Sequence, residues 1–222
     1  MKILAIDTSS SICSVAILED EKIIDKNELN DGKTHSENLM PLVDELLKRN
    51  SLDMAQINML ACSVGPGSFT GIRIGVSSIK PIAEVLNVKV ASVTSLETLA
   101  KNVTDAQTIV SLIDARNNQV YCGIFDKNYN KKEDYLADDI NVVIDNIKKY
   151  DDVICVGNGA VLHKDLLKKN ISNCKFTEDN NQSAVNVGKI GYKKYLENNL
   201  ETADTIMPIY LRKSQAERLK KN

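Results

Sequence analysis

The chain has 222 residues, of which 43% are hydrophobic, and it carries 28 basic and 30 acidic side chains for a net charge of −2. This length allows one large domain or two small ones, and the near-neutral charge argues against binding nucleic acid through charge alone. No apolar run approaches the roughly 18 residues that span a membrane, and the N-terminus reads as a strand and not as a signal peptide. A cytoplasmic protein without membrane contact is therefore expected.

Five cysteines are spread through the chain, and no two have the C-x-x-C spacing of a metal or redox motif. Most lie in apolar runs, such as residues 12–18 and 153–156. This usage predicts reduced core cysteines of a cytosolic protein, with neither a disulfide nor a metal site. They are Cys13, Cys62, Cys122, Cys155 and Cys174.

The N-terminal part predicts a three-stranded meander followed by a helix. The expected strands are residues 2–7, 12–18 and 22–29. The first strand ends in Asp7, and residues 8–11 follow it as a hydroxyl-rich turn. Thr34 and Glu37 have the spacing of a capping box, which predicts a helix that ends near Arg49.

A buried strand, a Gly-Pro-Gly turn and a long helix are predicted over residues 59–86. Gly65 and Gly67 allow positive φ angles and a close approach of the backbone to a neighbour. Ser68 and Thr70 can cap the helix that follows. A strand, glycine turn and helix in this order direct free N–H groups at one point, which suits an anion, but they suit tight packing equally well.

This helix carries two stripes at helical spacing. One is apolar and consists of Ile72, Val76, Ile79, Ala83 and Leu86; the other is small and consists of Gly71, Gly75 and Ser78. The small stripe lets another element come close, so internal packing alone and internal packing plus a docked partner both remain open. Pro81 removes the hydrogen bond to Ser77, which predicts a kink or an early end of the helix.

The second half of the chain repeats the first. Asp114 corresponds to Asp7 at an offset of 114 − 7 = 107 residues, about half the chain, and each aspartate ends an apolar strand. Apolar residues recur six, eight and ten positions beyond each aspartate. They are Cys13, Val15 and Ile17 in the first copy, and Val120, Cys122 and Ile124 in the second. This pattern favours a structural duplication over chance alternation.

After the second alternating strand, helices and strands continue to the end of the chain. The expected elements are a helix at 139–150, a strand at 153–156, helices at 161–169 and 181–198, and an extended piece at 207–211 before a basic helix or tail. No low-complexity linker is present, which predicts two α/β subdomains that share a tight interface. We place them at residues 1–103 and 104–222, with the last helix packing back on the first subdomain.

An acidic strand end followed by a Ser/Thr turn can hold the phosphates and Mg²⁺ of ATP. The candidate nucleotide-binding residues are Asp7, Thr8, Ser9, Ser10, Gly65, Gly67, Arg73, Asp114, Gly157 and Gly159. The second turn, residues 114–118, is bulkier and lacks glycine, which weakens the case for two phosphate loops. Gly157 and Gly159 also suit an ordinary strand-to-helix turn. Arg73 and Arg116 suit either a phosphate contact or a surface salt bridge.

The two histidines do not predict a catalytic or metal site. His35 lies at an expected helix start, where a capping or surface role is favoured, and His163 lies in a polar stretch. They have no metal-ligand spacing, so no zinc site and no catalytic residue is expected.

Five segments along the whole chain together resemble the TsaB (YeaZ) family. They are residues 1–10, 35–41, 65–75, 95–97 and 208–212, and the Gly-Pro-Gly-Ser-Phe-Thr-Gly-Ile-Arg core within 65–75 is highly specific. The resemblance implies an actin-like and sugar-kinase-like (ASKHA) duplicated α/β fold, with a mixed sheet flanked by helices in each subdomain. It implies a bacterial, non-catalytic partner of TsaD, with TsaE as a third protein. That system attaches threonylcarbamoyl to the adenosine next to the anticodon in tRNAs that read ANN codons, and tRNA contact by this chain is expected to be indirect.

One departure separates the chain from the catalytic TsaD proteins that it resembles. The two metal-binding histidines of TsaD align with Ser95 and Leu99, and neither side chain replaces an imidazole ligand. The resemblance also implies pairing through the first two helices, as a homodimer or with TsaD. The expected interface residues are His35, Leu39, Leu42, Val43, Leu46, Gly71, Ile72, Gly75, Val76, Ser78, Ile79 and Ile82.

Two other functions remain as alternatives. An ATPase or phosphotransferase would use the Asp7 turn, and a glycoprotease-like metallohydrolase is a further, weaker possibility. No intrinsic cofactor is expected, although ATP or ADP with Mg²⁺ could bind with low affinity or at a partner interface.

Overall fold

The computed structural model describes residues 1–212, and its chain divides into two compact units. The first unit consists of residues 1–98 and 182–209, and the second consists of 99–181 and, among the described residues, 210–212. This division differs from the expected one at 103/104 because residues 182–209 return to the first unit. The helix in that segment covers a face of the first sheet. The expected basic helix or tail falls after residue 212, outside the described residues.

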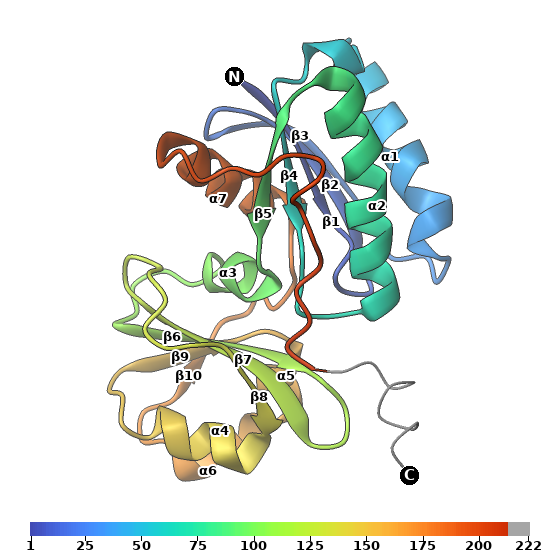
Figure 1. Cartoon of the computed structure of the whole chain (residues 1–222). Coiled ribbons are helices and arrows are strands. Elements are labelled where there is room, and N and C mark those ends of the chain that lie inside the picture. Colours follow the sequence, from blue (N-terminus) through green and yellow to red (C-terminus); the bar gives the residue numbers. More distant parts are fainter. Residues whose placement is uncertain (213–222) are drawn as a thin grey trace. The chain divides into compact units, whose positions relative to one another are not determined.

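The first unit is built on a mixed five-stranded sheet with the order β3-β2-β1-β4-β5 (Figure 1). Its strands are β1 (Lys2–Asp7), β2 (Cys13–Glu19), β3 (Lys22–Leu29), β4 (Met59–Ser63) and β5 (Lys89–Val93). β1, β2 and β3 form the expected antiparallel meander, and β4 and β5 continue the sheet in parallel.

Helices cover both faces of this sheet (Figure 1). α1 (His35–Arg49) and α2 (Phe69–Leu86) cover one face and α7 (Ala184–Leu196) covers the other. The short 3-10 helix η1 (Met54–Gln56) precedes β4, and α3 (Ser95–Ala100) follows β5 and contains the boundary between the two units. Successive side chains of β2 point to opposite faces of the sheet. Val15 and Ile17 belong to the core under α1 and α2, whereas Ala16 and Leu18 belong to the core under α7.

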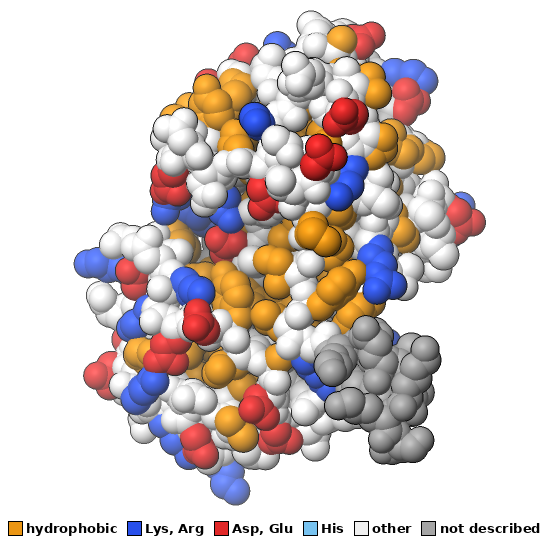
Figure 2. Space-filling view, viewed as in Figure 1, with side chains coloured by type: hydrophobic (Ala, Val, Ile, Leu, Met, Phe, Trp, Pro, Cys, Tyr) orange, Lys and Arg blue, Asp and Glu red, His pale blue; other side chains and the backbone are white. Residues whose placement is uncertain are grey.

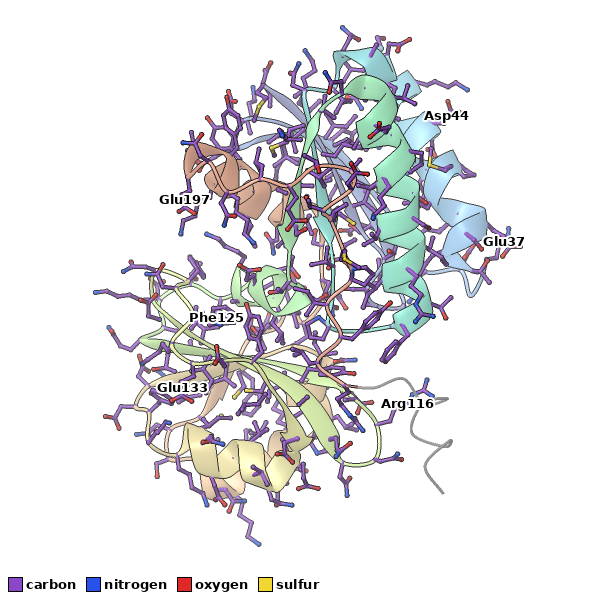
Figure 3. The ribbon with its side chains drawn as sticks, viewed as in Figure 1. Glu37, Asp44, Arg116, Phe125, Glu133 and Glu197 are labelled. Carbon is purple, nitrogen blue, oxygen red and sulfur yellow. The ribbon has the colours of Figure 1, made fainter. Side chains whose placement is uncertain are left out.

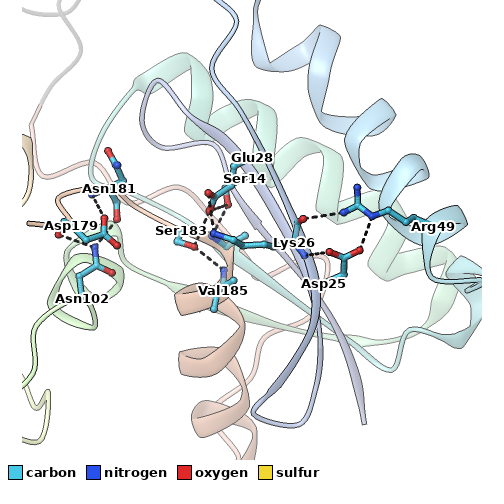
Figure 4. A network of polar contacts seen from close by, with 11 residues as sticks. Ser14, Asp25, Lys26, Glu28, Arg49, Asn102, Asp179, Asn181, Ser183 and Val185 are labelled. Carbon is cyan, nitrogen blue, oxygen red and sulfur yellow. Dashed lines mark hydrogen bonds and ion pairs between the residues drawn. The ribbon is translucent and has the colours of Figure 1, made fainter.

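Both ends of α1 are fixed by polar contacts that the sequence encodes. The expected capping box is confirmed, with the Thr34 N–H donating to Glu37 Oε2 at 3.0 Å. At the other end, Arg49 Nε donates to Asp25 Oδ2 on β3 at 2.7 Å (Figure 4), and this bond lowers the pKa of Asp25 to about 2. Glu37 and Asp44 point away from the sheet on the outer side of α1 (Figure 3).

The helix α2 does not end early at Pro81, contrary to one expectation. It continues to Leu86, where Asn87 closes it in the left-handed conformation. Pro81 and Ser77 both lie on the exposed side of the helix. The Ser77 carbonyl that loses its hydrogen bond therefore faces water, which removes much of the cost of an internal proline.

Side chains from three separate segments hold the start of α7 against the meander (Figure 4). The Ser183 hydroxyl accepts from the Val185 N–H as a helix cap and donates to Glu28 on β3. The Ala184 N–H donates to Ser14 Oγ on β2 at 2.9 Å. These bonds explain why residues distant in the sequence complete the first unit.

The second unit repeats the sheet of the first, with the order β10-β9-β6-β7-β8. Its strands are β6 (Thr108–Asp114), β7 (Gln119–Asp126), β8 (Leu136–Asp139), β9 (Val153–Val156) and β10 (Lys175–Phe176), and its helices are α4 (Ile140–Ile147), α5 (Asn158–Leu162) and α6 (Lys164–Asn170). β6 takes the place of β1, and the other four strands correspond in turn. The duplication is confirmed, although the short β8 and β10 were not expected from the sequence.

Within residues 1–212, none of the helices combines the length and the apolar character that crossing a bilayer requires.

Candidate functional site

The turn after β1 is built around a buried carboxylate. Asp7 is 1% exposed, and its Oδ1 accepts hydrogen bonds from the Ser9 N–H at 2.8 Å and the Ser9 hydroxyl at 2.7 Å. Its Oδ2 is buried and makes no hydrogen bond to any described residue. Burial raises the pKa of Asp7, and the two bonds from Ser9, together with the nearby Ser63 hydroxyl and His35, only partly oppose that effect.

The N-terminus of α2 packs directly on this turn. The Thr8 hydroxyl donates to the Gly71 carbonyl at 2.7 Å, and the Ser68 N–H donates to the Ser9 carbonyl at 2.8 Å. A Cβ atom on Gly71 would overlap the Thr8 carbonyl oxygen, and one on Gly67 would overlap the Ser9 carbonyl oxygen. The glycines of the Gly-Pro-Gly segment therefore serve close internal packing, which was one of the two alternatives for this motif.

The same contacts test whether the turn fits a nucleotide phosphate. A phosphate cradle needs free N–H and hydroxyl donors. The Ser9 N–H and hydroxyl both point to Asp7, and the Thr8 hydroxyl points to Gly71. The Ser10 hydroxyl accepts from the Ile12 N–H. The side-chain donors of Thr8 and Ser9 are therefore used within the protein, whereas the Ser10 hydroxyl keeps its own proton to donate, so the turn offers few side-chain donors to a phosphate.

His35 belongs to this cluster and is neither the helix cap nor a surface residue. It is the first residue of α1, after the cap Thr34, and its side chain is half-buried. His35 Nε2 lies 2.8 Å from the Ser10 carbonyl, and a Cβ atom on Gly71 would lie 3.1 Å from its ring. His35 therefore joins the start of α1 to the Asp7 turn.

The second unit places a related cluster at the end of β6. Asp114 Oδ1 accepts from the Arg116 N–H at 2.8 Å, on the loop where Figure 3 labels Arg116. Gly157 has a φ of +104°, and a Cβ atom there would overlap the Leu112 carbonyl oxygen. Gly157 and Gly159 thus form a strand-to-helix turn that packs on β6, much as Gly67 and Gly71 pack on the end of β1.

The predicted nucleotide-binding residues thus fall into separate groups. The first unit brings together Asp7, Thr8, Ser9, Ser10 and Gly67, and the second brings together Asp114, Gly157 and Gly159. Gly65 has a φ of +106° and packs against Ile72 and the Ile209 carbonyl, and Arg73 lies on the exposed side of α2. Nucleotide binding by these residues stays a prediction.

Most of the predicted interface residues are not available to a partner. Seven apolar residues are at most 6% exposed because they form the first core, and both glycines of the small stripe pack on Thr8. These seven are Leu39, Leu42, Val43, Leu46, Ile72, Val76 and Ile79. The expectation that the Gly71 and Gly75 stripe is an open docking surface is wrong for this reason. His35, Ser78 and Ile82 are partly exposed and remain candidates.

Sequence reasoning missed three accessible apolar residues on these helices. Ile74 is partly exposed, Met40 is 43% exposed and Val85 is 84% exposed. A signal was present, because residues 74, 78, 82 and 85 follow helical spacing beside the buried stripe.

The positions that align with the TsaD histidines have contacts of their own. Ser95 is buried, and its hydroxyl lies 3.0 Å from that of Ser63. Leu99 is buried in the second unit beside Gly157. Among the described residues, no group of three or more His, Cys, Asp and Glu side chains is arranged to hold a metal ion.

Asp7→Asn is expected to raise the free energy of unfolding at pH 7 by about 1 kcal/mol or more. The amide keeps the Oδ1 acceptor for Ser9 and cannot ionise, so folding no longer works against the ionisation of a buried carboxyl. Because the folded pKa of Asp7 is raised above 3.8, wild-type stability falls as the pH rises through that folded pKa, and the gap between the two proteins closes below about pH 3.8. Urea titrations across this pH range measure both effects.

Asp114→Asn is the control. Asp114 is the half-buried equivalent of Asp7 in the second unit, and its replacement should change the free energy of unfolding by less than about 0.5 kcal/mol.

The fold places the chain in a broad class of proteins. Two mixed five-stranded sheets of the same strand order form the duplicated actin-like (ASKHA) architecture. The solved activator of the 2-hydroxyisocaproyl-CoA dehydratase from Clostridium difficile with bound ADPNP matches it with a TM-score of 0.55 at 10% identity, over 95% of this chain and 100% of that chain. YeaZ from Pseudomonas aeruginosa matches with a TM-score of 0.83 at 23% identity, over 95% of this chain and 99% of that chain.

Sequence relatives narrow this class to one family. The tRNA threonylcarbamoyladenosine biosynthesis protein TsaB of Bacillus subtilis is 33% identical over 230 residues, which cover 98% of this chain and 96% of the relative. The protein of the same name from Haemophilus influenzae is 28% identical over 226 residues, 96% of this chain and 94% of the relative. The family model of TsaD, a tRNA N6-adenosine threonylcarbamoyltransferase, matches residues 23–220. The chain belongs to the TsaB (YeaZ) family, which is related to TsaD.

Proposed function

We propose that this chain is a non-catalytic accessory subunit for threonylcarbamoyladenosine formation on tRNA in the bacterial cytoplasm. Two full-length relatives carry that pathway in their names. The observation that carries the accessory role is the packing of α2 on the Asp7 turn, which uses the hydroxyls of Thr8 and Ser9 internally. The first unit keeps the actin-like frame, while the Thr8 and Ser9 hydroxyls that could have met a phosphate stabilise the fold.

The partner in this proposal is TsaD, and the docking surface is the outer side of α1 and α2. Ile74, Ser78 and Ile82 line one partly exposed edge of α2, with Val85 beyond them. Met40 adds an exposed apolar side chain on α1. Partly exposed apolar residues that already pack on a rigid core suit the centre of an interface. The same surface would join two copies of the chain when TsaD is absent, and TsaE would join the assembly as a third protein.

Contact with tRNA is indirect in this proposal. Figure 2 shows acidic and basic side chains interspersed over the described part of the face in view. The net charge of −2 offers little attraction to phosphates. The tRNA would therefore be held mainly by the partner.

The ATPase alternative keeps one point in its favour, which is the unpartnered Oδ2 of Asp7. A buried carboxylate oxygen of this kind suits a proton or a cation. The internal use of the Thr8 and Ser9 hydroxyls argues against tight nucleotide binding by the chain alone, and any ATP or ADP would bind with low affinity or in a complex.

Depletion of the protein in its host, followed by mass spectrometry of digested bulk tRNA, tests this function. Threonylcarbamoyladenosine is expected to disappear on depletion and to return with the wild-type gene. The Asp7→Asn variant distinguishes an accessory subunit from an ATPase. If the protein is an accessory subunit, the variant restores the modification; if it is an ATPase that depends on Asp7, the variant does not. Unchanged modification after depletion would overturn the role in this pathway.

A further inference from the structure

Two cysteines of the second unit lie within reach of each other. Cys155 is a buried residue of β9, and Cys174 is a half-buried residue directly before β10. Their Sγ atoms are 3.5 Å apart, and both thiols are free. They are 19 positions apart in the chain, so their proximity arises from the parallel pairing of β9 with β10.

The surroundings of Cys174 favour its thiolate. A hydrogen bond from Cys155 lowers the pKa of Cys174, and the nearby ammonium of Lys168 adds to that effect, although burial opposes it. The same helix places Lys164 and Lys168 at 5.4 and 5.9 Å from the Phe176 ring, which keeps two cations at this edge of the sheet. A partly exposed thiol in basic surroundings is the usual setting of a reactive cysteine.

The other cysteines have the opposite character. Burial raises the pKa of Cys13 to about 11 and that of Cys122 to about 12, and it raises the pKa of Cys62 further. Cys155 also has a raised pKa, because it donates the hydrogen bond to Cys174 and is buried. Of the two paired thiols, Cys174 is half-buried and Cys155 is buried, so a reagent in solution reaches Cys174 first. Cys174 is therefore the attacking thiol, and Cys155 is placed to act second.

We propose that Cys155 and Cys174 form an oxidisable pair that a low-molecular-weight disulfide converts into an intramolecular disulfide. The Cys174 thiolate attacks one sulfur of the reagent, forms a mixed disulfide and releases one thiolate. Cys155 then gives up its proton to solvent and attacks Cys174 Sγ, which releases the second thiolate. The two cysteines are oxidised, the reagent is reduced to two thiols, and no other co-reactant is needed.

The bond would join β9 to the start of β10 and enclose α5 and α6 in a covalent loop. β10 contains only two residues, so its place at the sheet edge depends on few backbone bonds. Oxidation would fix this edge, and reduction would release it.

Oxidised glutathione added to the purified full-length protein tests the pair. After the remaining thiols are blocked with iodoacetamide, trypsin places Cys155 in the peptide 150–164 and Cys174 in the peptide 170–175. We expect these peptides to become joined, with the loss of two hydrogen atoms, and to separate on reduction. A native protein in which they stay unlinked, or in which glutathione stays on Cys174, overturns the proposal.

Single variants test the order of the two steps. Cys155→Ser should accumulate glutathione on Cys174, Cys174→Ser should form neither product, and Cys122→Ser, a matched buried control in the same sheet, should behave like the wild type. If a variant does not fold, the order of iodoacetamide labelling in native wild-type protein decides the question. Cys174 should be labelled first, and labelling no faster than that of Cys122 overturns the assignment.

Discussion

Gly71→Ala is expected to destabilise the first unit by more than about 3 kcal/mol, a loss in the range of severe core substitutions. The added methyl group would overlap the Thr8 carbonyl oxygen, so α2 would have to move off the turn. That movement breaks the bond from the Thr8 hydroxyl to the Gly71 carbonyl and disturbs the bond from the Ser68 N–H to the Ser9 carbonyl. Urea unfolding followed by circular dichroism measures the loss.

Ser78→Ala on the same helix is the matched control. Ser78 is partly exposed, and alanine suits a helix slightly better than serine, so stability should change by less than about 0.5 kcal/mol. Equal unfolding midpoints for the two variants would mean that α2 does not pack on the turn as described. A bulky residue at Gly75 tests the same packing and not the docking surface, since its Cβ atom would lie 2.5 Å from Thr8 Oγ1.

Ile82→Arg is expected to weaken binding to TsaD by at least about 100-fold. The substitution puts a charge in the middle of the proposed apolar edge of α2, where docking would bury it without a partner. Titration calorimetry with purified TsaD from the same host gives the affinity. Sedimentation of the chain alone shows whether the same residue also holds two copies together.

Ile23→Arg is the control for this substitution. Ile23 is 42% exposed on β3, and it pairs with Leu18, whose side chain contacts α7. It therefore lies on the sheet face opposite α1 and α2, and its replacement should leave TsaD affinity unchanged. Val85→Arg, at a side chain that is 84% exposed, repeats the test if Ile82→Arg does not fold. Wild-type affinity of both folded α2 variants would exclude this face as the docking surface.

The duplication could be predicted because its signal is local in each copy. Asp7 and Asp114 each end an apolar strand, and the alternating residues beyond them face the same kind of core. Strand periodicity and turn chemistry depend on short stretches of sequence, so they can be recognised without knowledge of the tertiary contacts. The Thr34 and Glu37 capping box was predictable for the same reason.

The use of the small stripe on α2 could not be predicted in this way. Spacing shows that Gly71 and Gly75 share a helix face, but it does not show what that face meets, and the neighbour proves to be Thr8, more than 60 residues earlier. Cys155 and Cys174 illustrate the same limit. Their contact depends on the register of β9 with a two-residue strand that carries almost no periodic signal.

The return of α7 to the first unit has a consequence for how the chain folds as it is made. The face of the first sheet that contains Leu18, Ala61 and Ala91 is covered by residues of α7, which are synthesised only after all the strands and helices of the second unit. The elements of the second unit are contiguous in the chain between residues 99 and 181. One apolar face of the N-terminal sheet therefore stays uncovered until all the strands and helices of the second unit have been synthesised. On the ribosome, the sheet that is made first is the sheet whose second face is covered last.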